Sequence, residues 1–246
     1  MTAGAIDGGE LGLWTSWVSM DTRTAHKSGE TVWSMAAQQH GVVSRRQLIA
    51  LGWHPEAIKH RVRKGRLHRI RRGVYAVGRP NLSQRGHWMA AVLACGPDAL
   101  LSHRAAAALW GIRRKHASVG CAHFINVTVE AHRRPRSEGI RLHRVRGLVV
   151  EDRAQRYGIP VISPIRTLID LALVLTRSEL EGAITEADRL GLVTPEKLRS
   201  AADSRTGQQG VGPLRTILDR RTFSLTDSDL ERRSSTWLGR RGYRDR

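Results

Sequence analysis

The sequence has few cysteines and no long apolar run. Its 246 residues include 2 cysteines, Cys95 and Cys121, which form no Cys-x-x-Cys pair. A disulfide framework is therefore not expected. No stretch reaches the roughly 18 uncharged apolar residues that a membrane-spanning helix needs. The N-terminal residues also lack the basic start and apolar run of a secretory signal. We expect a cytoplasmic protein with reduced thiols and no membrane partner.

Signatures of the common enzyme classes are missing as well. The sequence contains no Walker loop, no Gly-x-Gly-x-x-Gly after a strand and no Gly-x-Ser-x-Gly. The segment 207–212 is rich in glycine, but it follows no apolar strand and contains no lysine. The 11 histidines are dispersed and form no His-Glu-x-x-His motif. We therefore expect no metal site, no cofactor and no enzymatic activity.

Acidic residues are few relative to basic ones. The chain has 22 Asp+Glu against 41 Lys+Arg, a formal net charge of +19. Only five of the basic residues are lysine, and an arginine bias of this kind often reflects a GC-rich genome. The distribution is more informative, because eleven basic residues and a single acid, Glu56, give +10 between Arg45 and Arg79. A local basic cluster indicates a nucleic-acid partner.

Three short helices and a hairpin are predicted in this basic region. The first helix has apolar residues at helical spacing from Val32 and stops at Gly41. Ser44, with a glutamine three residues later, matches a capping box and predicts a helix over 45–51. Pro55 suits the first position of a third helix that runs to Lys64. Strand-like residues around a glycine then predict a basic hairpin over 67–77.

This order is that of a winged helix-turn-helix, in which the third helix enters the major groove of DNA. The alternative is a three-helix unit with an ordinary solvated basic face. In the DNA-binding interpretation, the third helix reads bases and the other cations hold phosphates. The base-reading residues would be Lys59, His60, Arg63 and Lys64, and the phosphate-binding residues Arg45, Arg46, Arg66, Arg69, Arg71 and Arg72. Arg63→Ala should then reduce discrimination between sites, and Arg71→Ala should weaken all sites alike.

The middle of the chain is predicted to be a second domain with a small sheet. The fold class is therefore α+β, an N-terminal winged helix-turn-helix followed by a mixed α+β domain. Pro160 lies in the last predicted strand and favours an edge position there. Ser163 and Thr194 each precede a proline, the order of a helix start. The predicted helices are 84–95, 102–110, 164–175, 178–190, 194–202 and 211–220, and the predicted strands are 124–129, 140–145 and 159–162.

Two pairs of polar residues form a candidate polar site of this middle domain. His103 and Arg104 stand at the start of an apolar helix, where they would cap it or pair with a carboxylate such as Asp170. Arg166 and Asp170 are four residues apart on one predicted helix and can pair with each other. The simpler interpretation is structural, and the functional one is contact with a toxin or docking between domains.

Several blocks of the sequence resemble one known family. In the basic region they are Gly41-Val42-Val43-Ser44-Arg45, Gly65-Arg66-Leu67 and Arg72-Gly73-Val74-Tyr75. In the middle they are the segments 101–111 and 163–172. Together these blocks resemble actinobacterial antitoxins of the AbiEi type, the winged-helix repressors of type IV toxin–antitoxin systems, over residues 31–220. The resemblance implies an autorepressor that binds double-stranded DNA, with a cognate toxin as a further partner.

The C-terminal segment resembles the opening of a nuclease domain of the very-short-patch-repair type. Ser228-Asp229-Leu230-Glu231 is similar to that opening, but the apolar helix, the metal-binding Asp and the Glu-x-Lys element that should follow are absent. We therefore expect four parts: 1–28 disordered, 29–80 DNA-binding, 81–222 the α+β body, and 223–246 a poorly ordered nuclease remnant. Alternative functions are a truncated, inactive nuclease and a module that binds a toxin or another protein.

Overall fold

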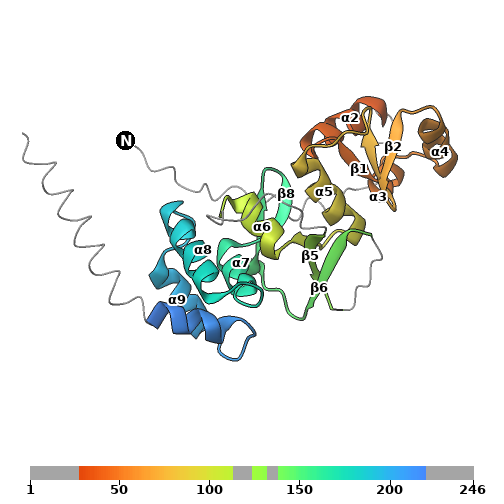
Figure 1. Cartoon of the computed structure of the whole chain (residues 1–246). Coiled ribbons are helices and arrows are strands. Elements are labelled where there is room, and N and C mark those ends of the chain that lie inside the picture. Colours follow the sequence, from red (N-terminus) through yellow and green to blue (C-terminus); the bar gives the residue numbers. More distant parts are fainter. Residues whose placement is uncertain (1–27, 113–123, 132–137, 220–246) are drawn as a thin grey trace, which may run out of the picture. The chain divides into compact units, whose positions relative to one another are not determined.

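The computed structural model describes residues 28–112, 124–131 and 138–219 (Figure 1). Almost all of the predicted disordered segment 1–28, and all of the predicted remnant 223–246, lie outside these ranges. The described residues divide into two compact units. The first holds those of Met1–Ala105 and Cys121–Ile162, and the second those of Ala106–Gly120 and Ser163–Arg246. The predicted domain boundary near residue 80 stays a prediction.

The first unit begins with a winged helix-turn-helix. Its elements follow the order helix, strand, helix, helix, strand, strand, and the antiparallel sheet has the strand order β1-β3-β2. Strand β1 precedes the second helix and was not predicted, because three residues are too few to show a period of two. The elements are α2 (Ser28–Gln38), β1 (Val42–Ser44), α3 (Arg45–Ala50), α4 (Pro55–Arg63), β2 (Leu67–Arg71) and β3 (Val74–Val77).

Local capping fixes the two helices of the helix-turn-helix. The predicted capping box is confirmed: the Gln47 amide donates to Ser44 Oγ at 3.2 Å, and the Ser44 amide donates to Gln47 Oε1 at 2.8 Å. Gly52 follows α3 with a φ of 82°, a left-handed conformation that glycine adopts without strain. Helix α4 then begins at Pro55, as predicted, with His54 as its N-cap.

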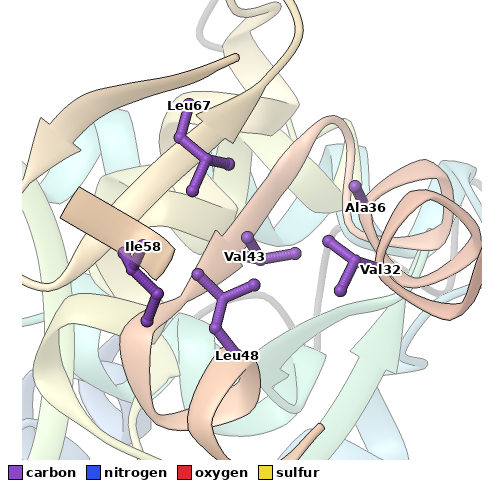
Figure 2. Close-up of a cluster of buried hydrophobic side chains, with 6 residues drawn as sticks. All are labelled: Val32, Ala36, Val43, Leu48, Ile58 and Leu67. Carbon is purple, nitrogen blue, oxygen red and sulfur yellow. The ribbon is translucent and has the colours of Figure 1, made fainter. Parts of the chain in front are cut away.

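An apolar cluster holds these elements together (Figure 2). It joins α2, β1, α3, α4 and β2 through side chains that are at most 3% exposed. Ile58 is therefore the inward anchor of α4, as its spacing predicts. The members are Val32, Ala36, Val43, Leu48, Ile58 and Leu67. The cluster sets the orientation of α4, so its opposite face is left for solvent or a ligand.

The rest of the first unit is a long helix and a mixed five-stranded sheet of order β6-β5-β4-β8-β7. The α+β class predicted from the sequence is confirmed. Helix α5 has the predicted bounds, and Ser83 Oγ caps it by accepting from the Gly86 amide at 3.2 Å. The elements are α5 (Gln84–Cys95), β4 (Leu100–Leu101), β5 (Ile125–Glu130), β6 (Ile140–Val145), the 3-10 helix η2 (Val150–Asp152), β7 (Arg153–Arg156) and β8 (Ile159–Ile162).

The predicted edge position of Pro160 is wrong. Strand β8 lies between β4 and β7, and Pro160 stands opposite Gln155 of β7. A proline is tolerated there because the pairing with β4 is a single register pair, Leu101 with Val161. Strands β4 and β7 were not predicted, since two apolar residues and a polar four-residue stretch show no alternation.

Helix α5 contacts the winged helix closely. A side chain at Gly86 would put its Cβ 2.9 Å from the carbonyl oxygen of His40, so only glycine allows this approach. His40 Nε2 also lies 2.7 Å from the carbonyl oxygen of Tyr157, which joins the end of α2 to the β7–β8 turn. The first of these contacts holds the N-terminal half of α5 against the end of α2.

The second unit is helical. Ser163 and Thr194 cap α7 and α9 as predicted, each directly before a proline. Gly210 packs against the carbonyl oxygen of Ile169, and a Cβ there would overlap that atom. Helix α6 (His103–Trp110) starts in the first unit and continues in the second. The others are α7 (Pro164–Leu171), α8 (Arg177–Arg189), α9 (Pro195–Asp203) and a helix over 211–219.

Candidate nucleic-acid interface

Helix α4 has one buried and one basic face. Ile58 is 2% exposed and Val62 is half-buried, so this side faces the apolar cluster. The predicted base-reading side chains are all exposed: Lys59, His60, Arg63 and Lys64. The helix is nine residues long and therefore about 13 Å in length. The sequence spacing thus correctly separated the two faces.

The cations of α4 differ in what they contact. Lys59 Nζ lies 2.8 Å from Glu56 Oε1, and this hydrogen bond and charge lower the pKa of the Glu56 carboxyl. Within the described ranges, His60, Arg63 and Lys64 make no side-chain hydrogen bond or ion pair. The last turn of α4 therefore presents three side chains that can donate hydrogen bonds to a ligand.

The start of α3 and the turn of the β2–β3 hairpin lie side by side. The Arg45 amide donates to the carbonyl oxygen of Gly73 at 2.7 Å, and β1 and β3 pair Ser44 with Val74. Gly73 has a φ of 72°, which the hairpin turn requires. The exposed residues Arg45 and Arg46 therefore lie near Arg72, which is also exposed and precedes the glycine.

The arginines of β2 differ from one another. Arg66, directly before the strand, and Arg69 within it are exposed. Arg71 is half-buried, and its Nη1 donates to the carbonyl oxygen of Glu138. Its Nε is buried and has no hydrogen-bond partner among the described residues, and burial lowers its pKa. A phosphate role for Arg71 stays a prediction, but this guanidinium already has a partner within the protein.

The histidine of the predicted polar site stacks on another histidine. The rings of His103 and His143 are 3.5 Å apart and nearly parallel at 20°, and His143 Nε2 lies 2.9 Å from Asn126 Oδ1. His103 is 6% exposed and has a φ of 49°, an unusual conformation for a residue other than glycine. Arg104 beside it is exposed. Sequence reasoning missed the stack because it depends on the pairing of β5 with β6.

The other two residues of that predicted site lie in the second unit. Arg166 Nε donates to Asp170 Oδ1 at 2.8 Å within α7, and both side chains are at least nine-tenths buried. The predicted pairing of these two residues is confirmed. A common site formed with His103 and Arg104 stays a prediction.

The described residues were also compared with the requirements of a metal site and of a membrane-spanning helix. None of their His, Cys, Asp or Glu side chains gather in threes where they could hold a metal ion. None of their helices is long and apolar enough to cross a bilayer.

Comparison with known families identifies one match. Residues 34–78 match the family described as "Transcriptional regulator, AbiEi antitoxin". This range begins within α2 and ends directly after β3, so it coincides with the winged helix. No curated protein matches the chain. The crystal structure of the RV2827C protein from Mycobacterium tuberculosis has a TM-score of 0.46 and 17% identity, and the alignment covers 81% of this chain and 78% of that chain.

Proposed function

We propose that the chain is a DNA-binding transcriptional regulator that acts as the antitoxin-type repressor of its own toxin–antitoxin operon. The observation that carries this proposal is the exposed group of His60, Arg63 and the C-cap residue Lys64 at the end of α4, opposite the buried Ile58. The match of residues 34–78 to a family of transcriptional regulators supports it. The proposal assigns no catalytic step to the chain and names DNA and a cognate toxin as its partners.

The cations at the end of α4 and the arginines around this helix would contact different parts of the DNA. A helix fits the major groove, about 12 Å wide, and there an arginine can donate two hydrogen bonds to a guanine edge. Arg63 and Lys64 would make such contacts. The exposed arginines around α4 would bind phosphates, which fixes the register but reads no sequence. They are Arg45, Arg46, Arg66, Arg69 and Arg72.

The salt dependence of binding tests the phosphate contacts. Five phosphate contacts per bound chain predict a slope of about −4.5 in a plot of log affinity against log salt concentration. A fourfold rise in salt should therefore weaken binding about five-hundredfold. The assay is fluorescence anisotropy with a labelled duplex from the DNA upstream of the chain's own gene. A slope near zero would overturn the proposal.

Two substitutions test whether base reading and phosphate binding are carried out by different residues. Arg63→Gln should reduce the ratio of the affinity for the upstream duplex to the affinity for a scrambled duplex by about tenfold or more, because a base contact is lost. Arg72→Gln should lower the affinity for both duplexes by the same factor and reduce the magnitude of the salt slope by about one. Arg72 tests phosphate binding better than Arg71 does, because the Arg71 guanidinium already donates to the carbonyl oxygen of Glu138. Arg144→Gln, an exposed arginine of β6, is the matched control. Equal effects of Arg63→Gln and Arg72→Gln on both measures would contradict the assigned roles.

The antitoxin role needs its own tests. A reporter under the upstream promoter should be repressed by the wild-type chain and released by Arg63→Gln. Co-expression with the neighbouring gene product should then yield a stable complex or relieve that product's toxicity. Repression without either effect would leave a regulator and contradict the antitoxin role.

A further inference from the structure

A cavity of about 430 Å³ lies in the first unit, between the start of α3, the β2–β3 turn and the C-terminal half of α5. Its size is within the range of small-molecule sites, about 300–1,000 Å³. The sequence did not reveal it, because its lining comes from separate segments of the chain between Ser44 and Pro160. Its two sides differ in chemistry.

One side of the cavity is apolar. Helix α5 supplies Val92, Leu93 and Cys95, of which Val92 and Cys95 are at most 4% exposed. Burial raises the pKa of the Cys95 thiol to about 12, so this thiol is uncharged at neutral pH. This wall can accept a hydrocarbon group without leaving a buried charge unpaired.

The other side of the cavity is cationic. It is lined by Arg45, Arg46 and Arg72, and the single acid of the whole lining is Asp98, shortly after the end of α5. Within the described ranges, these three guanidinium groups make no side-chain hydrogen bond or ion pair. Arginine donors form a planar fork that matches a carboxylate with two parallel hydrogen bonds. The lining therefore combines an apolar wall with an excess of available positive charge.

We propose that this cavity binds a small amphipathic carboxylate, with the hydrocarbon group against α5 and the carboxylate on the arginines, and that its occupation weakens DNA binding. The second part rests on the proposed function, since Arg45, Arg46 and Arg72 are also predicted phosphate contacts. Ligand and DNA would compete for the same guanidinium groups. By linkage, DNA lowers the affinity for the ligand by the factor by which the ligand lowers the affinity for DNA.

Direct calorimetric titration of the full chain tests the first part without DNA. Octanoate is the probe, and octanol and octylammonium carry the same hydrocarbon chain without the negative charge. Octanoate should bind about tenfold or more tightly than octanol, because a hydrogen bond to a charged group is lost in the alcohol. Octylammonium should bind more weakly than octanol. Equal binding of all three, or no binding of octanoate, would overturn the proposal.

Two variants separate this site from the DNA surface. Ala94→Phe adds a ring inside the cavity, at a half-buried position of α5, and should abolish octanoate binding while DNA binding persists. If Ala94→Phe does not fold, Ala94→Leu adds less volume and should weaken octanoate binding at least severalfold. Arg63→Gln, on α4 and outside the cavity, should retain octanoate binding although it loses discrimination between duplexes. Unaltered octanoate affinity in a folded Ala94 variant would overturn the site.

The regulatory part is tested by repeating the anisotropy titration with saturating octanoate. The wild-type chain should bind the upstream duplex about tenfold more weakly, and Ala94→Phe should not respond. Octanoate binding with an unchanged or tighter DNA affinity would refute the competition. If octanoate binds but no duplex does, the proposed function fails and the ligand site stands.

Discussion

The thiol of Cys95 should be almost inert in the folded chain. It lies at the end of α5, 4% exposed, and burial raises its pKa from 9.0 to about 12, with the nearby Arg71 as a smaller, opposing effect. At about pH 8, a thiol with a pKa of 9.0 is roughly one-tenth ionised, and one with a pKa of 12 about one ten-thousandth. Only the thiolate reacts, so alkylation should be slowed about a thousandfold.

Iodoacetamide and peptide mass spectrometry measure this rate. The folded chain is labelled over a time course, and the same chain in concentrated urea gives the reference rate for the peptide that contains Cys95. The comparison uses one peptide in two states, so Cys121 does not affect it. Labelling of Cys95 within tenfold of the reference rate would refute the assignment of a buried, protonated thiol.

The raised pKa of Cys95 also predicts how the stability of the folded chain changes with pH. The folded pKa of Cys95 lies above its ordinary value, so the protonated thiol contributes stability that is fully present below about pH 9. That contribution is lost as the pH rises through 9 toward 12, at about 1.4 kcal/mol per pH unit. Cys95→Ala should lose less stability on alkaline titration than the wild type. The difference is measured by urea unfolding at several pH values.

Three further predictions concern stability, each measured by urea unfolding. Leu48→Ala should destabilise the winged helix by about 3 kcal/mol, because Leu48 is fully buried in the apolar cluster. Ser44→Ala should cost about 1 kcal/mol through loss of the cap of α3, and a neutral result would contradict the observed capping box. Asp170→Asn should cost about 3 kcal/mol or more, since it removes the negative charge that faces the buried Arg166 guanidinium. Glu181→Gln, in a more exposed pair on α8, is the control and should cost no more than about 0.5 kcal/mol.

Local signals predicted much of the first unit. Ser44, followed by glutamine three residues later, marked the start of α3, and Pro55 marked that of α4. Helix α5 was predicted with its observed bounds, Gln84–Cys95. These signals act within one or two turns of the chain, so tertiary contacts have little opportunity to override them.

Sheet neighbours were less predictable. Pro160 favoured an edge, but β8 has a neighbour on both sides. The edge preference of Pro160 did not decide its position, because the pairing of β8 with β4 is short. Nothing in the sequence indicates that pairing. The stack of His103 on His143 was missed for a related reason, because it needs the register of β6 against β5.

The sequence by itself determined the basic face of α4, because helical periodicity separates Ile58 from Arg63 before any tertiary contact forms. It also placed the net +10 between Arg45 and Arg79 on the helix-turn-helix and its hairpin. Only the tertiary structure decided which of those arginines differ in their surroundings. Arg71 donates to the carbonyl oxygen of Glu138, and Arg72 lines a cavity with α5, because both contacts depend on how separate elements pack in the folded chain.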